Sequence, residues 1–124
     1  MIYLDTTTRK LQLVLAGAKT TNHLKSSVSY YDVINQTKDD NSEYRGSQQV
    51  ATSNDTTDVD ICAAPLHVGT IRNIRNITIY NADTVNATVT VKLDDGGTET
   101  IYITHVLTTT QSLIYEDGAG WIVI

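Results

Sequence analysis

The stretch Val85-Asn86-Ala87-Thr88-Val89-Thr90-Val91-Lys92-Leu93 decides the fold of this chain. Its apolar residues occupy the odd positions, and its polar residues lie between them. Successive side chains of a β-strand point to opposite faces of a sheet, so strict alternation predicts a strand with one buried face and one solvated face. A helix would scatter the same residues around its circumference.

Similar segments recur at short intervals on both sides of this stretch. Turn signals separate them, most clearly Asp94-Asp95-Gly96-Gly97 and Asp117-Gly118-Ala119-Gly120, where glycine tolerates the positive φ of a tight hairpin. Short strands at intervals of about 8–12 residues favour an antiparallel β-sandwich or barrel. The expected strands are 11–16, 28–34, 58–64, 71–81, 85–93, 98–107, 111–116 and 121–124.

The segment Ile71-Arg72-Asn73-Ile74-Arg75-Asn76-Ile77 departs from this alternation, because isoleucine returns at every third position. A β-bulge inserts one extra residue into a strand and resets which face each later side chain occupies. We therefore predict a bulge between residues 74 and 77.

The chain of 124 residues is expected to form one structural domain with three regions. Residues 1–35 are predicted to be an extended N-terminal arm with strands, although a helix competes with a strand over 9–16. Residues 36–58 are nearly devoid of apolar side chains and are predicted to form a polar loop, in which Val50 and Ala51 add at most a short strand. Residues 59–124 are predicted to form the antiparallel β core.

Composition excludes several classes of partner. The net charge of −5, with a sequence pI near 4.9, argues against nucleic acid, whose binding depends on Lys and Arg. No signal peptide and no apolar run of membrane-spanning length are recognised, so we expect a protein without a membrane partner, made in a reducing cytoplasm. The single cysteine, Cys62, lies in an apolar setting and is expected to be buried.

No motif for catalysis, a metal or a cofactor is evident. The histidines His23, His67 and His105 share no metal-ligand spacing, and the acidic stretch 54–60 lacks the glycine and final glutamate of an EF-hand. Carboxylate pairs occur at Asp39-Asp40, Asp94-Asp95 and Glu116-Asp117, all in expected turns or loops where solvent keeps them ionised. We therefore expect no enzyme activity and no cofactor.

Both ends of the chain are unusually apolar. The last residues, Trp121-Ile122-Val123-Ile124, are expected to close the protein's own sheet. For the N-terminal arm, docking on another subunit competes with folding back, because an added strand gains main-chain hydrogen bonds regardless of sequence. The candidate partner-binding residues are Ile2, Tyr3, Leu4, Leu11, Leu13, Leu15, Tyr30 and Tyr31.

Several stretches resemble the small virion structural proteins of tailed bacteriophages. In the first third, a leucine-rich segment ends in Ala16-Gly17-Ala18, a threonine-rich turn follows, and Ser29-Tyr30-Tyr31-Asp32-Val33 forms the next strand. The most specific stretches downstream are Asn81-Ala82-Asp83-Thr84-Val85 and Tyr115-Glu116-Asp117-Gly118-Ala119-Gly120-Trp121. The resemblance covers most of the chain, apart from roughly residues 36–58.

The resemblance implies a non-enzymatic capsid decoration (cement) protein on the outer surface of the virion head. Such a protein would be a homo-oligomer, with a trimer the first expectation, and would be made in the host bacterial cytoplasm. It would bridge and stabilise neighbouring copies of the major capsid protein. A head–tail or tail-associated structural subunit is an alternative.

A further alternative is a receptor- or carbohydrate-binding β module of a fibre. Tyr80, Tyr102 and Tyr115 would then face a sugar, and an exposed Trp121 would favour that interpretation over the structural one.

Overall fold

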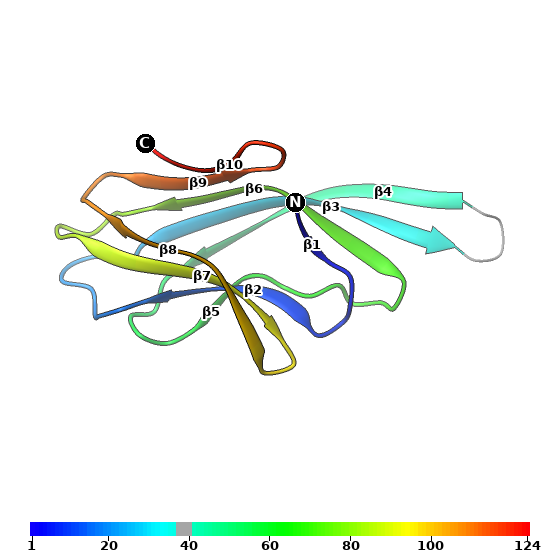
Figure 1. Cartoon of the computed structure of the whole chain (residues 1–124), viewed down its shortest axis with the longest axis horizontal. Coiled ribbons are helices and arrows are strands. Elements are labelled where there is room, and N and C mark those ends of the chain that lie inside the picture. Colours follow the sequence, from blue (N-terminus) through cyan, green and yellow to red (C-terminus); the bar gives the residue numbers. More distant parts are fainter. Residues whose placement is uncertain (37–40) are drawn as a thin grey trace.

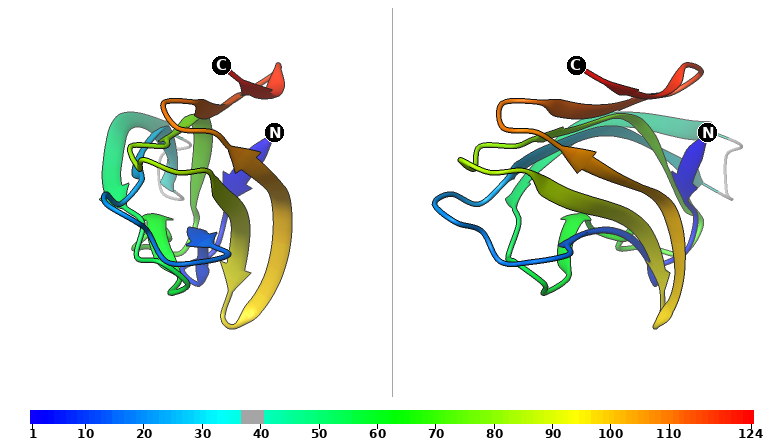
Figure 2. Two further views of the ribbon diagram at one scale, coloured as in Figure 1. Left: turned by 90° about the vertical axis from the view of Figure 1, so that its left-hand side faces the viewer. Right: turned by 60° about the vertical axis from the view of Figure 1, so that its left-hand side comes forward.

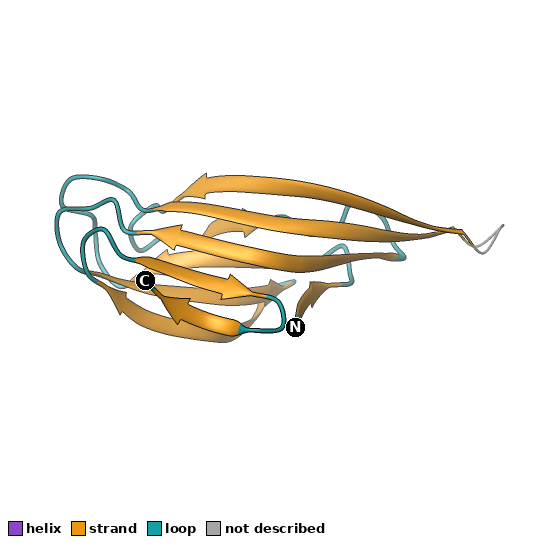
Figure 3. Cartoon of the chain, turned by 90° about the horizontal axis from the view of Figure 1, so that it is seen from above, coloured by secondary structure: helices purple, strands orange, loops and turns teal. Residues whose placement is uncertain are grey.

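The computed structural model describes residues 1–36 and 41–124, with side chains described for 1–34 and 45–124. The described chain contains strands and loops but no helix (Figure 3). Its strands, in chain order, are β1 (Ile2–Leu4), β2 (Arg9–Leu15), β3 (Lys25–Gln36), β4 (Asn41–Thr52), β5 (Val59–Cys62), β6 (Thr70–Tyr80), β7 (Ala87–Asp95), β8 (Thr98–Leu107), β9 (Ser112–Glu116) and β10 (Gly120–Val123).

The strands form two antiparallel sheets that pack face to face (Figure 1). The larger sheet has the order β10-β9-β6-β3-β4, and β1 pairs with the same edge of β6 as β9 does. The smaller sheet has the order β5-β2-β7-β8. Both sheets are open, so the all-β sandwich prediction is confirmed and the barrel alternative is wrong.

The core lies between the two sheets and is built from the inward-facing residues of both. Val89 and Val91 of β7 are fully buried, as the alternation in the quoted stretch requires. The other buried apolar side chains are Ile2, Leu4, Leu11, Leu13, Leu15, Leu24, Val28, Ile61, Cys62, Ile74, Ile77, Ile79, Leu107, Leu113 and Tyr115.

The predicted N-terminal arm is part of this core. β1 pairs with β6 through Ile2–Ile74 and Leu4–Arg72, and both apolar side chains of β1 are buried. β2 occupies the middle of the smaller sheet, between β5 and β7, and is a strand and not the competing helix. The prediction of an extended arm is therefore wrong and the folding-back alternative is confirmed, because Leu11, Leu13 and Leu15 complete the apolar face that Val89 and Val91 begin.

The predicted polar loop over 36–58 is also wrong, because most of it is strand β4. β4 pairs with β3 in continuous register, from Lys25 opposite Thr52 to Gln36 opposite Asn41. Main-chain hydrogen bonds hold this pairing, and an edge strand needs few apolar side chains, which explains why its composition was misleading. Residues 37–40, which include the Asp39-Asp40 carboxylate pair, lie outside the described residues.

The bulge predicted between residues 74 and 77 is confirmed. Ile74 lies opposite Tyr30 and Asn76 lies opposite Ser29, so Arg75 is the extra residue of β6 with no counterpart on β3. Before the bulge the even-numbered residues Arg72 and Ile74 point inward, and after it Ile77 and Ile79 do so. The irregular repeat of isoleucine thus keeps Ile74, Ile77 and Ile79 of β6 in the core.

Truncating a leucine of β2, which was predicted to belong to an extended arm, should destabilise the whole protein. Leu13→Ala removes a fully buried side chain from the central strand of the smaller sheet, and such changes cost about 3 kcal/mol because a cavity remains. Urea denaturation should show this loss, whereas Leu66→Ala, at an exposed loop position, should leave the midpoint unchanged. A Leu13→Ala protein as stable as the wild type would contradict the placement of β2.

Candidate functional site

The bulge in β6 creates a groove on the outer face of the larger sheet. It turns Arg75 outward, where the guanidinium lies over the Tyr31 ring with its central carbon 5.7 Å from the ring centroid. Cation–π contacts of this kind hold a guanidinium in a defined position. Asp117, in the β9–β10 turn, donates its main-chain N–H to the carbonyl of Arg75 at 2.9 Å, which brings the turn to the same place.

The groove has a volume of about 790 Å³. Small-molecule sites span roughly 300–1,000 Å³, so this groove is large enough to hold a ligand. It crosses β3, β4, β6 and the β9–β10 hairpin, and is lined by Ser29, Tyr31, Gly46, Arg75, Asn76, Glu116 and Asp117.

Gly46 gives the groove its depth, although nothing in the backbone requires a glycine there. Its φ is outside the left-handed region, and a Cβ added to it would meet only the main-chain oxygen of Tyr30, at 4.0 Å. Glycine weakens a strand interior and often marks a place where a ligand approaches the backbone closely. A side chain here would project into the space between Tyr31 and the other lining residues.

A second surface lies along the side of the sandwich formed by β8 and β10. β8 is the outermost strand of the smaller sheet, and within the described residues it pairs only with β7. Figure 2 shows β8 on the side of the sandwich opposite β4. Four aliphatic side chains are exposed on these two strands and just after them: Ile101 by 64% and Val106 by 50% on β8, Ile122 by 54% on β10, and Ile124, which follows β10, by 66%. We call these four residues the apolar edge.

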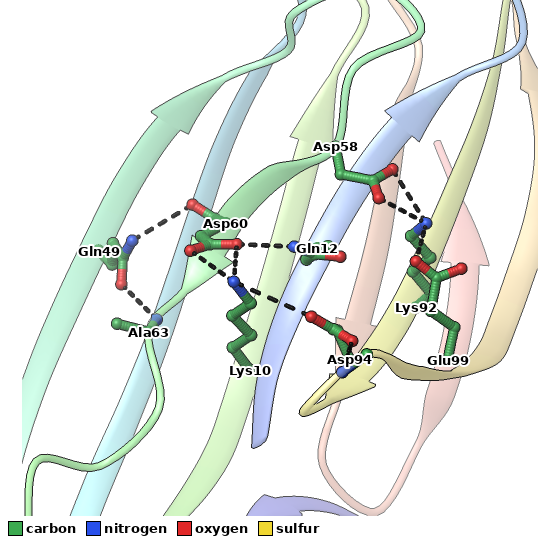
Figure 4. A network of polar contacts seen from close by, with 10 residues as sticks. Lys10, Gln12, Gln49, Asp58, Asp60, Ala63, Lys92, Asp94 and Glu99 are labelled. Atoms are coloured by element: carbon green, nitrogen blue, oxygen red, sulfur yellow. Dashed lines mark hydrogen bonds and ion pairs between the residues drawn. The ribbon is translucent and has the colours of Figure 1, made fainter. Parts of the chain in front are cut away.

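The opposite side of the sandwich is bridged by a polar side chain. Gln49 of β4 donates to the main-chain oxygen of Asp60 at 3.3 Å and accepts from the main-chain nitrogen of Ala63 at 2.8 Å (Figure 4). One glutamine therefore connects the edge of the larger sheet to the edge of the smaller sheet. The β4–β5 side is thus connected by side-chain hydrogen bonds, whereas the β8–β10 side exposes aliphatic residues beside polar ones such as Thr100 and Thr104.

Most of the predicted partner-binding residues are buried and cannot contact another molecule. Ile2, Leu4, Leu11, Leu13 and Leu15 are buried in the protein's own core, so the prediction that they contact a partner is wrong. Tyr30 packs partly buried against the core. Tyr31 lines the groove, and Tyr3 is exposed at the edge of β6, opposite Asn73.

The three tyrosines considered for sugar binding do not all lie together. Tyr115 is buried, and its ring centroid lies 5.1 Å from that of the partly buried Trp121. Tyr102 is the extra residue at a bulge of β8. Tyr80 lines a separate groove that also contains Val50. Burial of the Trp121 ring against Tyr115 favours a structural role for that tryptophan.

A largely buried ion pair joins β3 and β6. Arg72 donates from Nε and one terminal nitrogen to the two carboxylate oxygens of Asp32, at 2.8 and 3.0 Å, and from its other terminal nitrogen to the carbonyl of Ala63. Its guanidinium carbon lies 4.2 Å from the centroid of the Tyr30 ring. Arg72 therefore has a structural role, because each of these contacts is made within the protein itself.

The Asn81–Val85 stretch, one of the most specific parts of the resemblance, is a structural junction between loops. Asp83 accepts main-chain N–H groups from Thr20, Thr21, Asn22 and Thr84 at 2.8–3.1 Å. These hydrogen bonds favour the ionised form and hold the pKa of the Asp83 carboxyl well below its usual range. The fully buried Asn81 donates to the carbonyls of Val85 and Leu107.

The acidic stretch 54–60 is likewise occupied by contacts within the protein. Asp55 accepts the main-chain N–H of Lys19, Asp58 pairs with Lys92, and Asp60 pairs with Lys10. Figure 4 shows the last two pairs on the outer face of the smaller sheet, with Glu99 also bonded to Lys92. These carboxylates hold strands together.

The remaining titratable groups suggest no reactive centre. Within the described residues, no group of three or more His, Cys, Asp or Glu is placed to hold a metal ion. Cys62 is buried, and this desolvation raises the pKa of its thiol to about 11, so little thiolate exists at neutral pH. The described part of the chain contains no helix long and apolar enough to cross a lipid bilayer.

Comparison of this chain with protein-family models, curated proteins and solved structures finds no match.

Breaking the buried ion pair should cost more than removing it. Arg72→Met leaves the Asp32 carboxylate buried without its partner, a change that costs about 3 kcal/mol or more. The double variant Arg72→Met, Asp32→Leu replaces both charges with apolar groups and should be more stable than Arg72→Met alone. Urea denaturation of the two proteins tests this, and equal stabilities would show that the pair is not coupled.

Asp83→Asn should lower stability at neutral pH, because the amide NH₂ would face main-chain donors. The contribution of Asp83 is complete above the pKa of an unfolded aspartate, about 3.9. It is lost as the pH falls from there through the lowered folded-state pKa. The difference in urea midpoint between wild type and Asp83→Asn should thus be constant above about pH 5 and should shrink progressively as the pH falls below about 4. Glu116→Gln, at an exposed carboxylate, serves as the control; a pH-independent difference for Asp83→Asn would exclude this mechanism.

Proposed function

We propose that this protein is a non-enzymatic structural subunit of a bacteriophage virion. In this proposal it is a decoration protein that binds the outer surface of the head and bridges neighbouring major capsid subunits. The resemblance of its hairpin and loop sequences to small phage virion proteins supports the proposal. The structure supports it through the apolar edge, which is the one observation that carries it.

The apolar edge has the chemistry of a docking surface. Soluble proteins usually protect a long edge strand with charges, bulges or covering elements, because its unpaired main-chain groups invite another strand. β8 has a bulge at Tyr102 and a charge at Glu99. However, Ile101, next to the bulge, and Val106, farther along the strand, are exposed aliphatic residues. Burying such side chains contributes roughly 25 cal/mol per Å² of apolar surface.

Binding of this kind stabilises a shell without any reaction. A protein that binds only the assembled state shifts the equilibrium toward that state by mass action. The polar chemistry inside the fold is consistent with this role, because Arg72, Asp83 and Lys92 are committed to ion pairs and hydrogen bonds that hold strands and loops together.

The test is cosedimentation of the purified protein with expanded empty capsids of the phage that encodes it. Wild type should saturate at a fixed number of copies per capsid subunit. Ile101→Glu and Val106→Glu each place a charge on the apolar edge and should abolish binding. Val50→Glu makes the same kind of change on β4, where Val50 is 71% exposed, and should bind as wild type does.

Two outcomes would overturn the proposal as stated. Binding that never saturates, or edge variants that bind as well as wild type, would remove the apolar edge as the docking surface. Cosedimentation with isolated tails in place of heads would favour the head–tail or tail-associated alternative.

A further inference from the structure

We propose that the groove on the outer face of the larger sheet binds a neutral saccharide. The groove is the surface lined by Ser29, Tyr31, Gly46, Arg75, Asn76, Glu116 and Asp117. This inference does not rest on the proposed virion role, because no residue that lines the groove belongs to the apolar edge.

Two departures from regular β-structure meet at this groove. The bulge delivers Arg75 to the outer face, and Gly46 removes the side chain that would fill the space beside Tyr31. A bulge interrupts ladder pairing, and a glycine in a strand interior costs conformational entropy. The bulge is also needed to keep Ile74, Ile77 and Ile79 together in the core, but the fold makes no such demand for glycine at position 46.

The lining groups match the chemistry of a sugar. Each sugar hydroxyl both donates and accepts a hydrogen bond, so it needs donors and acceptors together. Arg75 and the Asn76 amide supply donors, and the carboxylates of Glu116 and Asp117 supply acceptors. The ring of Tyr31 lies beneath the Arg75 guanidinium and so helps to fix the position of that donor in the groove.

The charges at the groove select against other ligands. One guanidinium and two carboxylates line it, so its net charge is negative, in a chain whose own net charge is −5. Phosphate esters, nucleic acid and acidic sugars would be repelled. Lipids and apolar molecules would leave the charged lining groups desolvated and unpaired. A neutral ligand with several hydroxyl groups avoids both penalties.

The experiment is saturation-transfer difference NMR of the full chain with a defined panel of probes. The panel contains the methyl glycosides of glucose, galactose, mannose and N-acetylglucosamine, with the corresponding disaccharides, and sialic acid as an acidic probe. At least one neutral sugar should give signals and sialic acid should give none. Titration of that sugar then yields a dissociation constant for each variant.

Two substitutions test the groove by different routes. Gly46→Val fills it with a residue that favours strands, and Arg75→Met removes the charged donor. Each should weaken binding about tenfold or more, the loss expected for one hydrogen bond to a charged group. Thr52→Val alters a residue on the same strand and face outside the groove, and should bind as wild type does. Thermal denaturation verifies that all variants are folded.

The proposal fails if no neutral sugar of the panel binds, or if a folded Gly46→Val protein binds as tightly as wild type. Binding of sialic acid in preference to neutral sugars would contradict the charge argument. Capsid cosedimentation of the same Gly46→Val protein separates the two proposals, because the apolar edge is intact in it.

Discussion

The pairing of β6 with β3, interrupted by one extra residue at Arg75, is the constraint on which this structure depends. β6 is the hub of the larger sheet, since it also pairs with β1 and β9 along its other edge. A shift of one residue along a strand turns every side chain to the opposite face. Without the bulge, either Ile74 or the pair Ile77 and Ile79 would face solvent, and the core could not close over both halves of the sheet.

The same irregularity organises the polar chemistry. On one side of the bulge, Arg72 turns inward to Asp32 and the ring of Tyr30; at the bulge itself, Arg75 turns outward over Tyr31. Two arginines three residues apart thus have opposite roles, one holding β3 to β6 and the other lining an open groove. The hydrogen bonds to Asp83 and the ion pairs of Lys92 have structural roles like that of Arg72.

The two sides of the sandwich and the outer face of the larger sheet carry different kinds of side chains. Gln49 ties the larger sheet to the smaller one on the β4–β5 side. The β8–β10 side exposes aliphatic residues and the strand β8, which among the described residues pairs only with β7. The groove occupies the outer face of the larger sheet. The groove shares no lining residue with the apolar edge, so substitutions can test the two proposals separately.

The sequence by itself determined the all-β class, most strands and the bulge near Arg75, because alternation and its interruption are local properties of β-structure. It did not determine which apolar segment lies inside: Leu11, Leu13 and Leu15 have the same pattern whether they cover a partner or their own core. Nor did it reveal β4, whose partner is a neighbouring backbone and whose side chains are mainly polar. The groove and the apolar edge were decided only by tertiary structure, because Gly46, Arg75 and Asp117 meet through strand order and register.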